Sequence, residues 1–366
     1  MSGMLSQVIQ RDSKLETELV VIDENNINAE AENAIKRAGE VIRRGGLVAF
    51  PTETVYGLGG DALNPESSKK IYAAKGRPSD NPLIVHIADI KDLELITDGV
   101  SEAALKLAKA YWPGPLTMIM NKSDKVPLET TGGLGTVAIR MPNNKIALEL
   151  IKTSGGYIAA PSANTSGRPS PTVARYCVED LGGKIEMIID GGQVGIGLES
   201  TIVDLTSEVP MILRPGYITA DMIEKVLGEV TIDKTIIDSS SNLKPKAPGM
   251  KYKHYAPKGN LTIVSGPQDK VVEYINGETK KAMEEGKRTG VIGTDSTTSL
   301  YKADTVKSLG NREDEKTIAH ELFKALREFD DEGIDVMFSE SFDDSGIGQA
   351  IMNRLLKAAG HNVISL

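Results

Sequence analysis

Short, almost wholly apolar segments alternate with helical patterns from Ala31 to Leu227. A strand with one face in water alternates apolar and polar residues, whereas a continuously apolar strand is buried on both faces. The alternation therefore predicts an α/β domain in which helices cover a mixed, twisted sheet. The expected strands are Leu47–Pro51, Pro82–Ala88, Leu116–Met120, Thr136–Met141, Tyr157–Ala160, Met187–Asp190, Ser200–Leu205 and Met211–Arg214. The expected helices are Ala31–Arg44, Pro65–Ala74, Ser101–Trp112, Lys145–Ser154, Pro171–Leu181 and Ala220–Leu227.

The pattern stops between residues 233 and 260, in a polar stretch with three prolines in SSSNLKPKAPGMKYKHYAPKGN. A solvated spacer between domains is one interpretation. The same stretch carries five lysines and the three rings of Tyr252, His254 and Tyr255. Long segments of this kind often act as lids, so a lid over a binding site is the other interpretation.

A second α/β pattern begins at Leu261, where LTIVSG and GVIGTD are expected strands on either side of a helix. Glu313–Glu332 has one apolar stripe and predicts a long amphipathic helix. We therefore expect three parts: a large α/β domain at 28–232, which is the candidate catalytic domain, a linker or lid at 233–260, and a small Rossmann-like α/β domain at 261–366. The first 25 or so residues are expected to be a variable extension. No dinucleotide fingerprint or P-loop motif is present in the sequence.

Composition excludes several classes of protein. The chain has 366 residues and a net charge of -9, which argues against a surface built to hold long nucleic acids. A single cysteine, Cys177, allows no internal disulfide and no cysteine-rich zinc site, so a cytoplasmic protein is expected. The N-terminal segment lacks the apolar run of a signal peptide, and no stretch approaches the ~18 apolar residues of a membrane span.

Polar groups follow the expected strands at five places, where open α/β sheets bind ligands. FPTETVYGLGGDA places Thr52, Glu53 and Thr54 just after a strand, although an ordinary loop with glycine turns is equally compatible. In KGRPSDNPLIVHI, Lys75 and Arg77 either balance a helix dipole or clamp phosphate at the loop side of a site. His86, in the apolar run of that motif, is more often a core histidine than a functional one.

The remaining three motifs are similar in character. GGLGTVAIRMP contains glycines that can form an anion-binding nest, together with Arg140, which either grips an anion or forms a buried ion pair. IAAPSANTSGRPSPT offers a loop of small hydroxyl and amide side chains. GLESTIVD and LRPG place Glu199 and Ser200 at the start of one strand and Arg214 at the end of the next. Together the five strand ends predict a site for a polyphosphate nucleotide and a small zwitterion.

These motifs resemble the YrdC family of threonylcarbamoyl-AMP synthases, and APGMKYKHYAP followed by a small α/β domain resembles its long two-domain branch. The resemblance implies a YrdC-like fold and a nucleotidyltransferase that converts L-threonine, bicarbonate or CO2, and ATP to threonylcarbamoyl-AMP and pyrophosphate. It also implies a downstream transferase that moves the threonylcarbamoyl group to tRNA, next to the anticodon. Neither a membrane association nor a stable nucleic-acid complex is expected.

Residue roles follow from the same resemblance. Lys75 and Arg77 are implied as the catalytic phosphate clamps. The implied ATP-binding residues are Lys75, Arg77, Ser79, Asn81, Thr136, Ser162, Asn164, Ser170, Arg214 and Tyr252. The implied threonine-binding residues are Thr52, His86, Arg140, Ala160 and Ser200. The implied lid residues are Lys251, Tyr252, His254 and Tyr255.

The reaction requires positioning and charge neutralisation rather than an enzyme nucleophile. Magnesium is expected to travel with the phosphates of ATP, with no protein metal site, and Glu53 and Glu199 are the carboxylates of interest. Two other functions are also compatible with the sequence. One is an RNA-binding module that uses the same basic residues, and the other is a generic amino-acid adenylating enzyme.

Overall fold

The computed structural model describes residues 6–9, 15–233 and 254–366. The chain divides into two compact units. The first unit consists of Met1–Ser166, Ser170–Gly195 and Glu199–Lys251, and the second of Gly167–Pro169, Ile196–Leu198 and Tyr252–Leu366. Two short loop segments from the middle of the chain therefore belong to the C-terminal unit.

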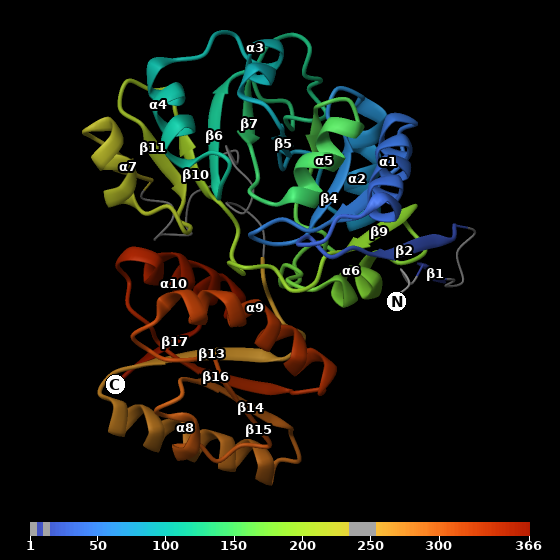
Figure 1. Cartoon of the computed structure of the whole chain (residues 1–366). Coiled ribbons are helices and arrows are strands. Elements are labelled where there is room, and N and C mark those ends of the chain that lie inside the picture. The colour runs from blue at the N-terminus through green and yellow to red at the C-terminus, as the bar shows by residue number, and fades with distance from the viewer. Residues whose placement is uncertain (1–5, 10–14, 234–253) are drawn as a thin grey trace. The chain divides into compact units, whose positions relative to one another are not determined.

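A mixed sheet forms the centre of the first unit (Figure 1). The strand order is β1-β2-β9-β3-β4-β8-β5-β7-β6-β10-β11-β12, with both parallel and antiparallel pairs. The strands are β1 Ser6–Ile9, β2 Thr17–Val21, β3 Val48–Phe50, β4 Gly57–Asp61, β5 Ile84–His86, β6 Leu116–Asn121, β7 Thr136–Arg140, β8 Ile158–Ala159, β9 Met187–Asp190, β10 Thr201–Asp204, β11 Met211–Arg214 and β12 Thr231–Ile232. The predicted mixed α/β fold is confirmed.

Five of the helices described in this unit begin after a residue whose side chain caps the helix. Asn64 accepts from the backbone N–H of Glu66 before Pro65 opens α2, and Asn144 caps α5 by accepting from Ala147. Gly76 ends α2 in the left-handed conformation that favours glycine. The helices are α1 Ala29–Arg43, α2 Pro65–Lys75, α3 Leu93–Ile96, α4 Glu102–Tyr111, α5 Lys145–Thr153, α6 Ala174–Leu181 and α7 Ala220–Leu227.

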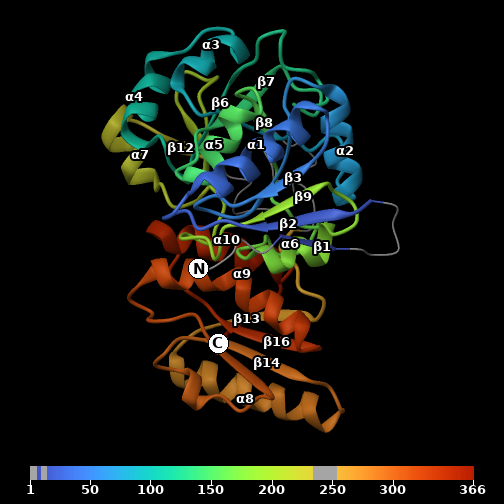
Figure 2. The same ribbon diagram turned by 45° about the vertical axis from the view of Figure 1, so that its right-hand side comes forward.

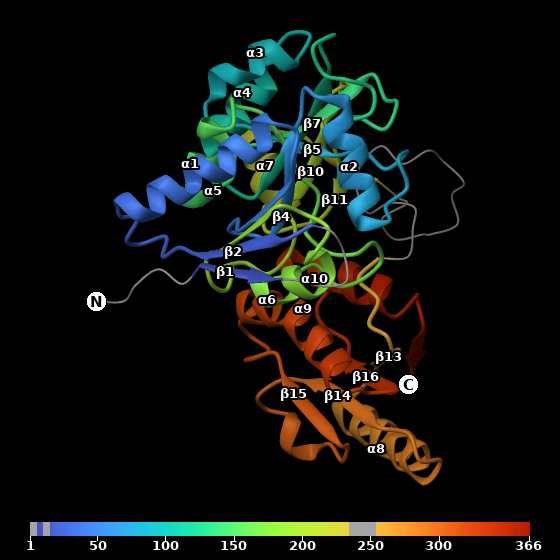
Figure 3. The same ribbon diagram turned by 90° about the vertical axis from the view of Figure 1, so that its right-hand side faces the viewer.

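The two faces of the sheet are covered differently. One face carries the larger core, where residues of β5, β6 and β7 pack with side chains of α2, α4, α6 and α7. On the other face, α1 and α5 pack over β3, β8 and β9. Figure 3 shows these two helices side by side. The rest of that face holds a smaller buried cluster, whose members come from strands and the residues that adjoin them. They are Ile84, Ile119, Ala138, Ile202 and Leu213.

Four strands described in this unit, β1, β2, β4 and β12, were not expected from the sequence. The segment GLGGD was interpreted as a turn-rich loop, but Gly57–Asp61 forms β4. A Cβ atom on Gly59 would lie 2.9 Å from both Ile158 and Phe50, so close packing, rather than a turn, requires glycine there. The N-terminal residues were expected to be a variable extension, yet Thr17–Val21 forms β2, which pairs with β9 beside β3 (Figure 2).

The second unit contains a five-stranded parallel sheet in the order β15-β14-β16-β13-β17. Helix α8 lies on one face, and α9 and α10 lie on the other (Figure 1). This is the predicted Rossmann-like arrangement. Its elements are β13 Asn260–Ser265, α8 Gln268–Glu284, β14 Thr289–Gly293, β15 Thr305–Ser308, α9 Glu315–Asp331, β16 Val336–Glu340, α10 Gly346–Ala358 and β17 Val363–Ser365.

Helix α9 holds the two short loop segments of this unit. The fully buried Arg327 donates from Nε to the carbonyl of Pro169 at 2.9 Å, and Arg168 forms an ion pair with Asp330 at 3.2 Å. Gly197 lies so close to the backbone of α9 that a Cβ atom would be 2.5 Å from the carbonyl oxygen of Ala319. These contacts fix both segments to the C-terminal unit.

Among the described residues, no helix is both long enough and apolar enough to cross a lipid bilayer.

Packing between α1 and α5 generates a test of the fold. A Cβ atom on Gly39 would lie 2.6 Å from Oγ1 and 2.8 Å from the backbone carbon of Thr153. We expect Gly39→Ala to lower the free energy of unfolding by about 1–3 kcal/mol, because the two helices must move apart. Urea titration followed by the fluorescence of Trp112, the single tryptophan, reports on this unit.

Asn33→Ala is the matched control, since Asn33 is exposed on the same helix and alanine favours helix. If Gly39→Ala were as stable as this control, the close approach of α1 and α5 would be wrong.

Candidate active site

The residues with the most distinctive environment lie on the less covered sheet face. Alternate residues of β7 point to opposite faces, so Val137 and Ile139 join the larger core, while Ala138 and Arg140 face the other way. The register places Arg140 directly beside His86 of β5 and Thr117 of β6. A charged guanidinium therefore lies next to the apolar strand cluster, and it is only 4% exposed.

Arg140 is held by the loop that follows β3. Its Nη1 donates to the Thr54 hydroxyl at 2.8 Å. The Thr52 hydroxyl donates to the carbonyl of Val55 at 2.7 Å and lies 2.9 Å from Oγ1 of Thr54. Because the Thr52 proton is committed, Thr54 donates to Thr52 and can accept from Arg140. This chain of hydrogen bonds makes the loop a fixed support for the guanidinium.

Glu53 provides the counterion of Arg140. Its Oε2 lies 2.7 Å from Nη2 of Arg140, and the two side chains are 12% and 5% exposed. The contact is an ion pair without the alignment of a hydrogen bond. Within the described part of the chain, both oxygens of Glu53 and the Nε and Nη2 atoms of Arg140 have no hydrogen-bond partner. The sequence left open an anion grip or a buried ion pair for Arg140, and the structure shows the ion pair.

A second set of hydrogen bonds continues across the same face. The Thr117 and Ser200 hydroxyls are 2.7 Å apart. Arg214 donates from Nε to the Ser200 carbonyl at 3.0 Å and from Nη2 to the Ser200 hydroxyl at 3.1 Å. Arg214 is 5% exposed, so the possibility of a surface arginine in a plain hairpin is wrong.

His86 is buried beside this charged group. Burial and the neighbouring Arg140 charge lower the pKa of His86 to about 3, and its Nδ1 lies 3.1 Å from the carbonyl of Ile84. A neutral imidazole is therefore present at physiological pH. His86 is therefore a buried core histidine, as its apolar surroundings predicted, and it also lies next to Arg140.

Lys75 lies deeper than the sequence suggested. We expected Lys75 and Arg77 at the loop side of the site, but Lys75 is the last residue of α2 and is 2% exposed. Its ammonium group donates to the carbonyls of Ser162 and Asn164, while the Ser162 hydroxyl donates to Oδ1 of Asn164 at 2.5 Å. Three of the residues implied for ATP are thus in direct contact. The expectation that Lys75 lies at the loop side rather than in the core is wrong, because the loop after β8 covers the helix end.

Arg77 organises the next turn of the chain. Its Nε donates to the carbonyl of Asn81 at 3.3 Å, and its Nη2 donates to the carbonyl of Pro82 at 3.1 Å. Asn81 is 2% exposed, and within the described residues its side-chain oxygen has no hydrogen-bond partner. Ser79, in contrast, is exposed on the loop.

Other implied residues occupy separate places on the first unit. Thr136 is half-buried at the start of β7, opposite Asn121 of β6. Ser170 donates to Oε1 of Glu199 at 2.5 Å. This hydrogen bond connects the IAAPSANTSGRPSPT motif with the GLESTIVD motif. The backbone N–H of Ala160 donates to the carbonyl of Ile84 at 2.8 Å, so that N–H is committed to the sheet.

The proposed lid falls largely outside the described residues, which include neither Lys251 nor Tyr252. His254 and Tyr255 are described and are buried in the second unit. The Tyr255 ring packs 5.0 Å from the Phe323 ring of α9, centroid to centroid. Tyr255 thus anchors the end of the linker to the C-terminal unit.

Sequence reasoning gave no role to two residues that the structure brings into the site. Thr54 was noted as a polar group and Thr117 was not mentioned at all. Both bear hydroxyls that are fully buried and hydrogen-bonded to site residues. Threonine is common in strands for its β-branched shape, so the presence of Thr117 in β6 carries no functional signal.

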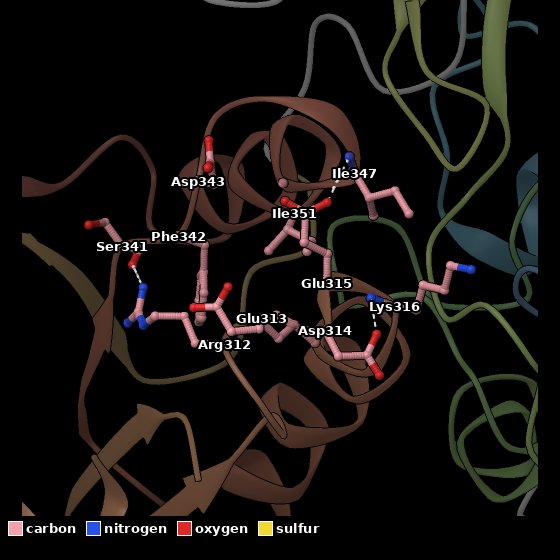
Figure 4. Close-up of a pocket in the computed structure, with 12 residues that line it drawn as sticks. Arg312, Glu313, Asp314, Glu315, Lys316, Ser341, Phe342, Asp343, Ile347 and Ile351 are labelled. Carbon is pink, nitrogen blue, oxygen red and sulfur yellow. Dashed lines mark hydrogen bonds between the residues drawn. The ribbon is translucent and has the colours of Figure 1, made fainter. Parts of the chain in front are cut away.

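A separate hollow of about 630 Å³ lies in the second unit, between the first turns of α9 and α10 and the end of β16 (Figure 4). The polar groups around it serve the fold. Asp314 caps α9, Glu315 accepts from the backbone N–H of Ile347, and Arg312 forms an ion pair with Glu340. We therefore assign the candidate active site to the first unit, where the buried ion pair of Glu53 and Arg140 has polar atoms that lack hydrogen bonds.

The lowered pKa of His86 generates a pH prediction. Below about pH 6.5, His86 is protonated in the unfolded chain but stays neutral in the folded protein. The free energy of unfolding therefore falls as the pH decreases from 6.5 towards 3. We expect this to cost about 1.4 kcal/mol per pH unit. His86→Gln should remove that part of the slope while leaving the slope above pH 7 unchanged. Urea titrations at pH 7.5, 6.0 and 5.0 with Trp112 fluorescence measure both proteins, and equal slopes would contradict the neutral, buried assignment.

Comparison with known proteins identifies the family. A family model for Sua5, YciO and YrdC proteins, described as telomere recombination, matches residues 40–216. The model for the C-terminal domain of threonylcarbamoyl-AMP synthase matches residues 218–360. Together the two models cover most of the chain, and the second corresponds to the long branch.

Individual relatives agree with the family models. Threonylcarbamoyl-AMP synthase of Pyrococcus abyssi is 52% identical over 91% of this chain and 96% of its own length. The Bacillus subtilis enzyme of the same name is 50% identical over 94% of this chain and 97% of its own length. The crystal structure of P. abyssi Sua5 complexed with L-threonine is 50% identical, covers 95% of this chain and 99% of that one, and superposes with a TM-score of 0.89. The chain belongs to the threonylcarbamoyl-AMP synthase family.

Proposed function

We propose that this chain uses ATP to activate L-threonine and bicarbonate, or CO2, as threonylcarbamoyl-AMP with release of pyrophosphate. The observation that carries the proposal is the pairing of two different polar regions within one unit. Arg140 with its threonine and carboxylate neighbours suits a small zwitterion, whereas Lys75, Arg77 and the Ser162–Asn164 loop suit a polyphosphate. The threonine complex of the P. abyssi relative supports threonine as the zwitterion.

The amino-acid side of the site rests on strands. Thr52, His86, Arg140, the Ala160 backbone and Ser200 are the threonine-binding residues that we propose. Hydrogen bonds already fix Thr52 through Thr54 to Arg140, and Ser200 to Thr117. Thr54 takes its place beside Thr52 in this set, since its hydroxyl contacts both partners. A site supported in this way needs little reorganisation when the ligand binds.

The nucleotide side rests on a helix end and loops. We propose that Lys75 and Arg77 stabilise negative charge on the phosphates, with Ser79, Asn81, Thr136, Ser162, Asn164, Ser170, Arg214 and Tyr252 as further contacts. The buried, unpartnered side-chain oxygen of Asn81 supports a ligand contact there. Several of the cations are deeply buried in a chain whose net charge is -9, so the positive potential is local.

The chemistry then requires few groups. The threonine amine adds CO2 and loses a proton, or combines with bicarbonate and loses water, to give a carbamate. The carbamate oxygen then attacks the α-phosphorus of ATP, and pyrophosphate leaves. Charge accumulates on the phosphoryl oxygens, where fixed cations stabilise it, and exclusion of water protects the labile carbamate. A lid formed by Lys251, Tyr252, His254 and Tyr255 would provide that exclusion. His254–Tyr255 is the only His–Tyr dipeptide in the sequence. A solved structure of P. abyssi Sua5 in which an adjacent histidine and tyrosine are both replaced by alanine is 49% identical to this chain and superposes with a TM-score of 0.90.

Magnesium, in this proposal, arrives with ATP and stays on its phosphates and on water. No group of three or more His, Cys, Asp or Glu residues suited to a metal occurs in the described ranges. Glu199 already accepts a hydrogen bond from Ser170, and Glu53 is paired with Arg140. The product would pass to a separate transferase that modifies tRNA, in the cytoplasm.

The direct test is a reaction assay. We expect purified protein to release pyrophosphate from ATP only when L-threonine and bicarbonate are both present. With labelled bicarbonate, the adenylate should retain the label. An unlabelled threonyl-adenylate would indicate a generic adenylating enzyme. ATP cleavage independent of threonine, together with tight and salt-sensitive RNA binding, would favour the RNA-binding alternative.

Substitution of Lys75 tests the phosphate clamp. We expect Lys75→Ala to abolish pyrophosphate release, because a positive charge is lost beside the Ser162–Asn164 loop. It should also reduce stability by about 1–3 kcal/mol, since the carbonyls of Ser162 and Asn164 lose a buried donor. Pyrophosphate assay and thermal unfolding measure the two effects.

Lys69→Ala serves as the control because Lys69 is exposed on the same helix and pairs only with surface Glu66. Near-normal turnover of a folded Lys75→Ala protein would exclude Lys75 as a phosphate ligand.

A further inference from the structure

Glu53 and Arg140 form an arrangement that the fold alone does not explain. They are oppositely charged, lie 2.7 Å apart and are almost completely buried. Both Glu53 oxygens, and the Nε and Nη2 donors of Arg140, nevertheless lack hydrogen bonds to any described residue. Buried polar atoms without partners are uncommon in folded proteins, and a cluster of four at one ion pair points to an absent ligand.

The four atoms match the charge pattern of an amino acid. The adjacent Nε and Nη2 atoms of Arg140 can donate in parallel to the two oxygens of an α-carboxylate. The carboxylate of Glu53, directly beside them, can accept from an α-ammonium group. A zwitterion would satisfy all four atoms at once, with each of its charged ends facing the opposite charge.

Neighbouring carboxylates are less suitable for this role. Glu199 accepts the hydroxyl of Ser170 at 2.5 Å, and Asp190 lies beside the hydroxyl of Tyr56 and accepts from the backbone of Gly192. Glu53 forms an ion pair with Arg140, but neither of its oxygens accepts a hydrogen bond from a described residue. It also stands between Thr52 and Thr54, whose hydrogen bonds hold the loop in place.

We propose that Glu53 binds the α-ammonium group of the amino-acid substrate while Arg140 binds its α-carboxylate. The assignment rests on the proposed function, because that function supplies the amino acid. The assignment makes Glu53 a specificity-determining residue. Its carboxylate favours a ligand with an α-ammonium group, whose nitrogen becomes the carbamate, over an acid that carries a hydroxyl at that position.

The test compares two ligands by calorimetry without ATP or bicarbonate. One is L-threonine, and the other is the 2,3-dihydroxybutanoate of matching stereochemistry, in which a hydroxyl replaces the α-ammonium group. Wild-type protein should bind L-threonine roughly 10- to 100-fold more tightly, as expected for a charge-assisted hydrogen bond. Glu53→Gln should weaken threonine binding and leave the analogue unaffected, so that the preference falls to within a few-fold.

Two further variants keep the test decisive. Glu53→Gln leaves the buried Arg140 without its counterion and can fail to fold. Glu53→Asp retains the charge on a shorter side chain, and should bind threonine with intermediate preference. Glu32→Gln, an exposed carboxylate of α1, should retain the full wild-type preference.

The outcomes separate this inference from the proposed function. Equal wild-type affinity for both ligands, or an unchanged preference in folded Glu53→Gln, would overturn the role of Glu53 while threonine binding stands. Failure of L-threonine to bind wild-type protein would instead overturn the proposed function itself.

Discussion

Burial of the Arg140 guanidinium is the constraint on which the arrangement of the site depends. Arginine keeps its charge at any physiological pH, so a side chain that is 4% exposed must be met by acceptors and a counterion. The acceptor is Thr54 and the counterion is Glu53, both in the loop after β3. Because β3 and β7 are not neighbours in the sheet, this one residue ties together strands that the ladder leaves apart.

The same face explains why a site can exist there at all. Helices α1 and α5 cover only part of it, and the remaining apolar cluster is drawn from strands and their ends. Polar residues surround that cluster where strands begin or end, as with His86, Ser200 and Arg214. An apolar centre with hydrogen-bonding groups at its edge is the usual composition of a ligand site.

Much of this was accessible from the sequence, and the failures have physical causes. Wholly apolar strands and capped helices predicted the α/β fold, because burial on two faces and capping leave local signals. Gly57–Asp61 was not predicted as a strand, because its glycines suggest a turn. They are required instead by the close packing of Phe50 and Ile158, residues outside the segment. Lys75 was expected at the loop side of the site rather than in the core, and only the tertiary position of the Ser162–Asn164 loop buries it.

The two ends of the proposed site differ in how the fold supports them. Arg140, Thr117 and His86 are strand residues in fixed register, so the sheet holds the end that we propose for the amino acid. Lys75 is at a helix end, and Ser162, Asn164 and Ser170 lie in loops. Ser170 directly follows Pro169, whose carbonyl is held by Arg327 of α9 within the C-terminal unit. In the proposed function, the loop that would contact ATP is therefore continuous in the chain with a segment that belongs to the C-terminal unit.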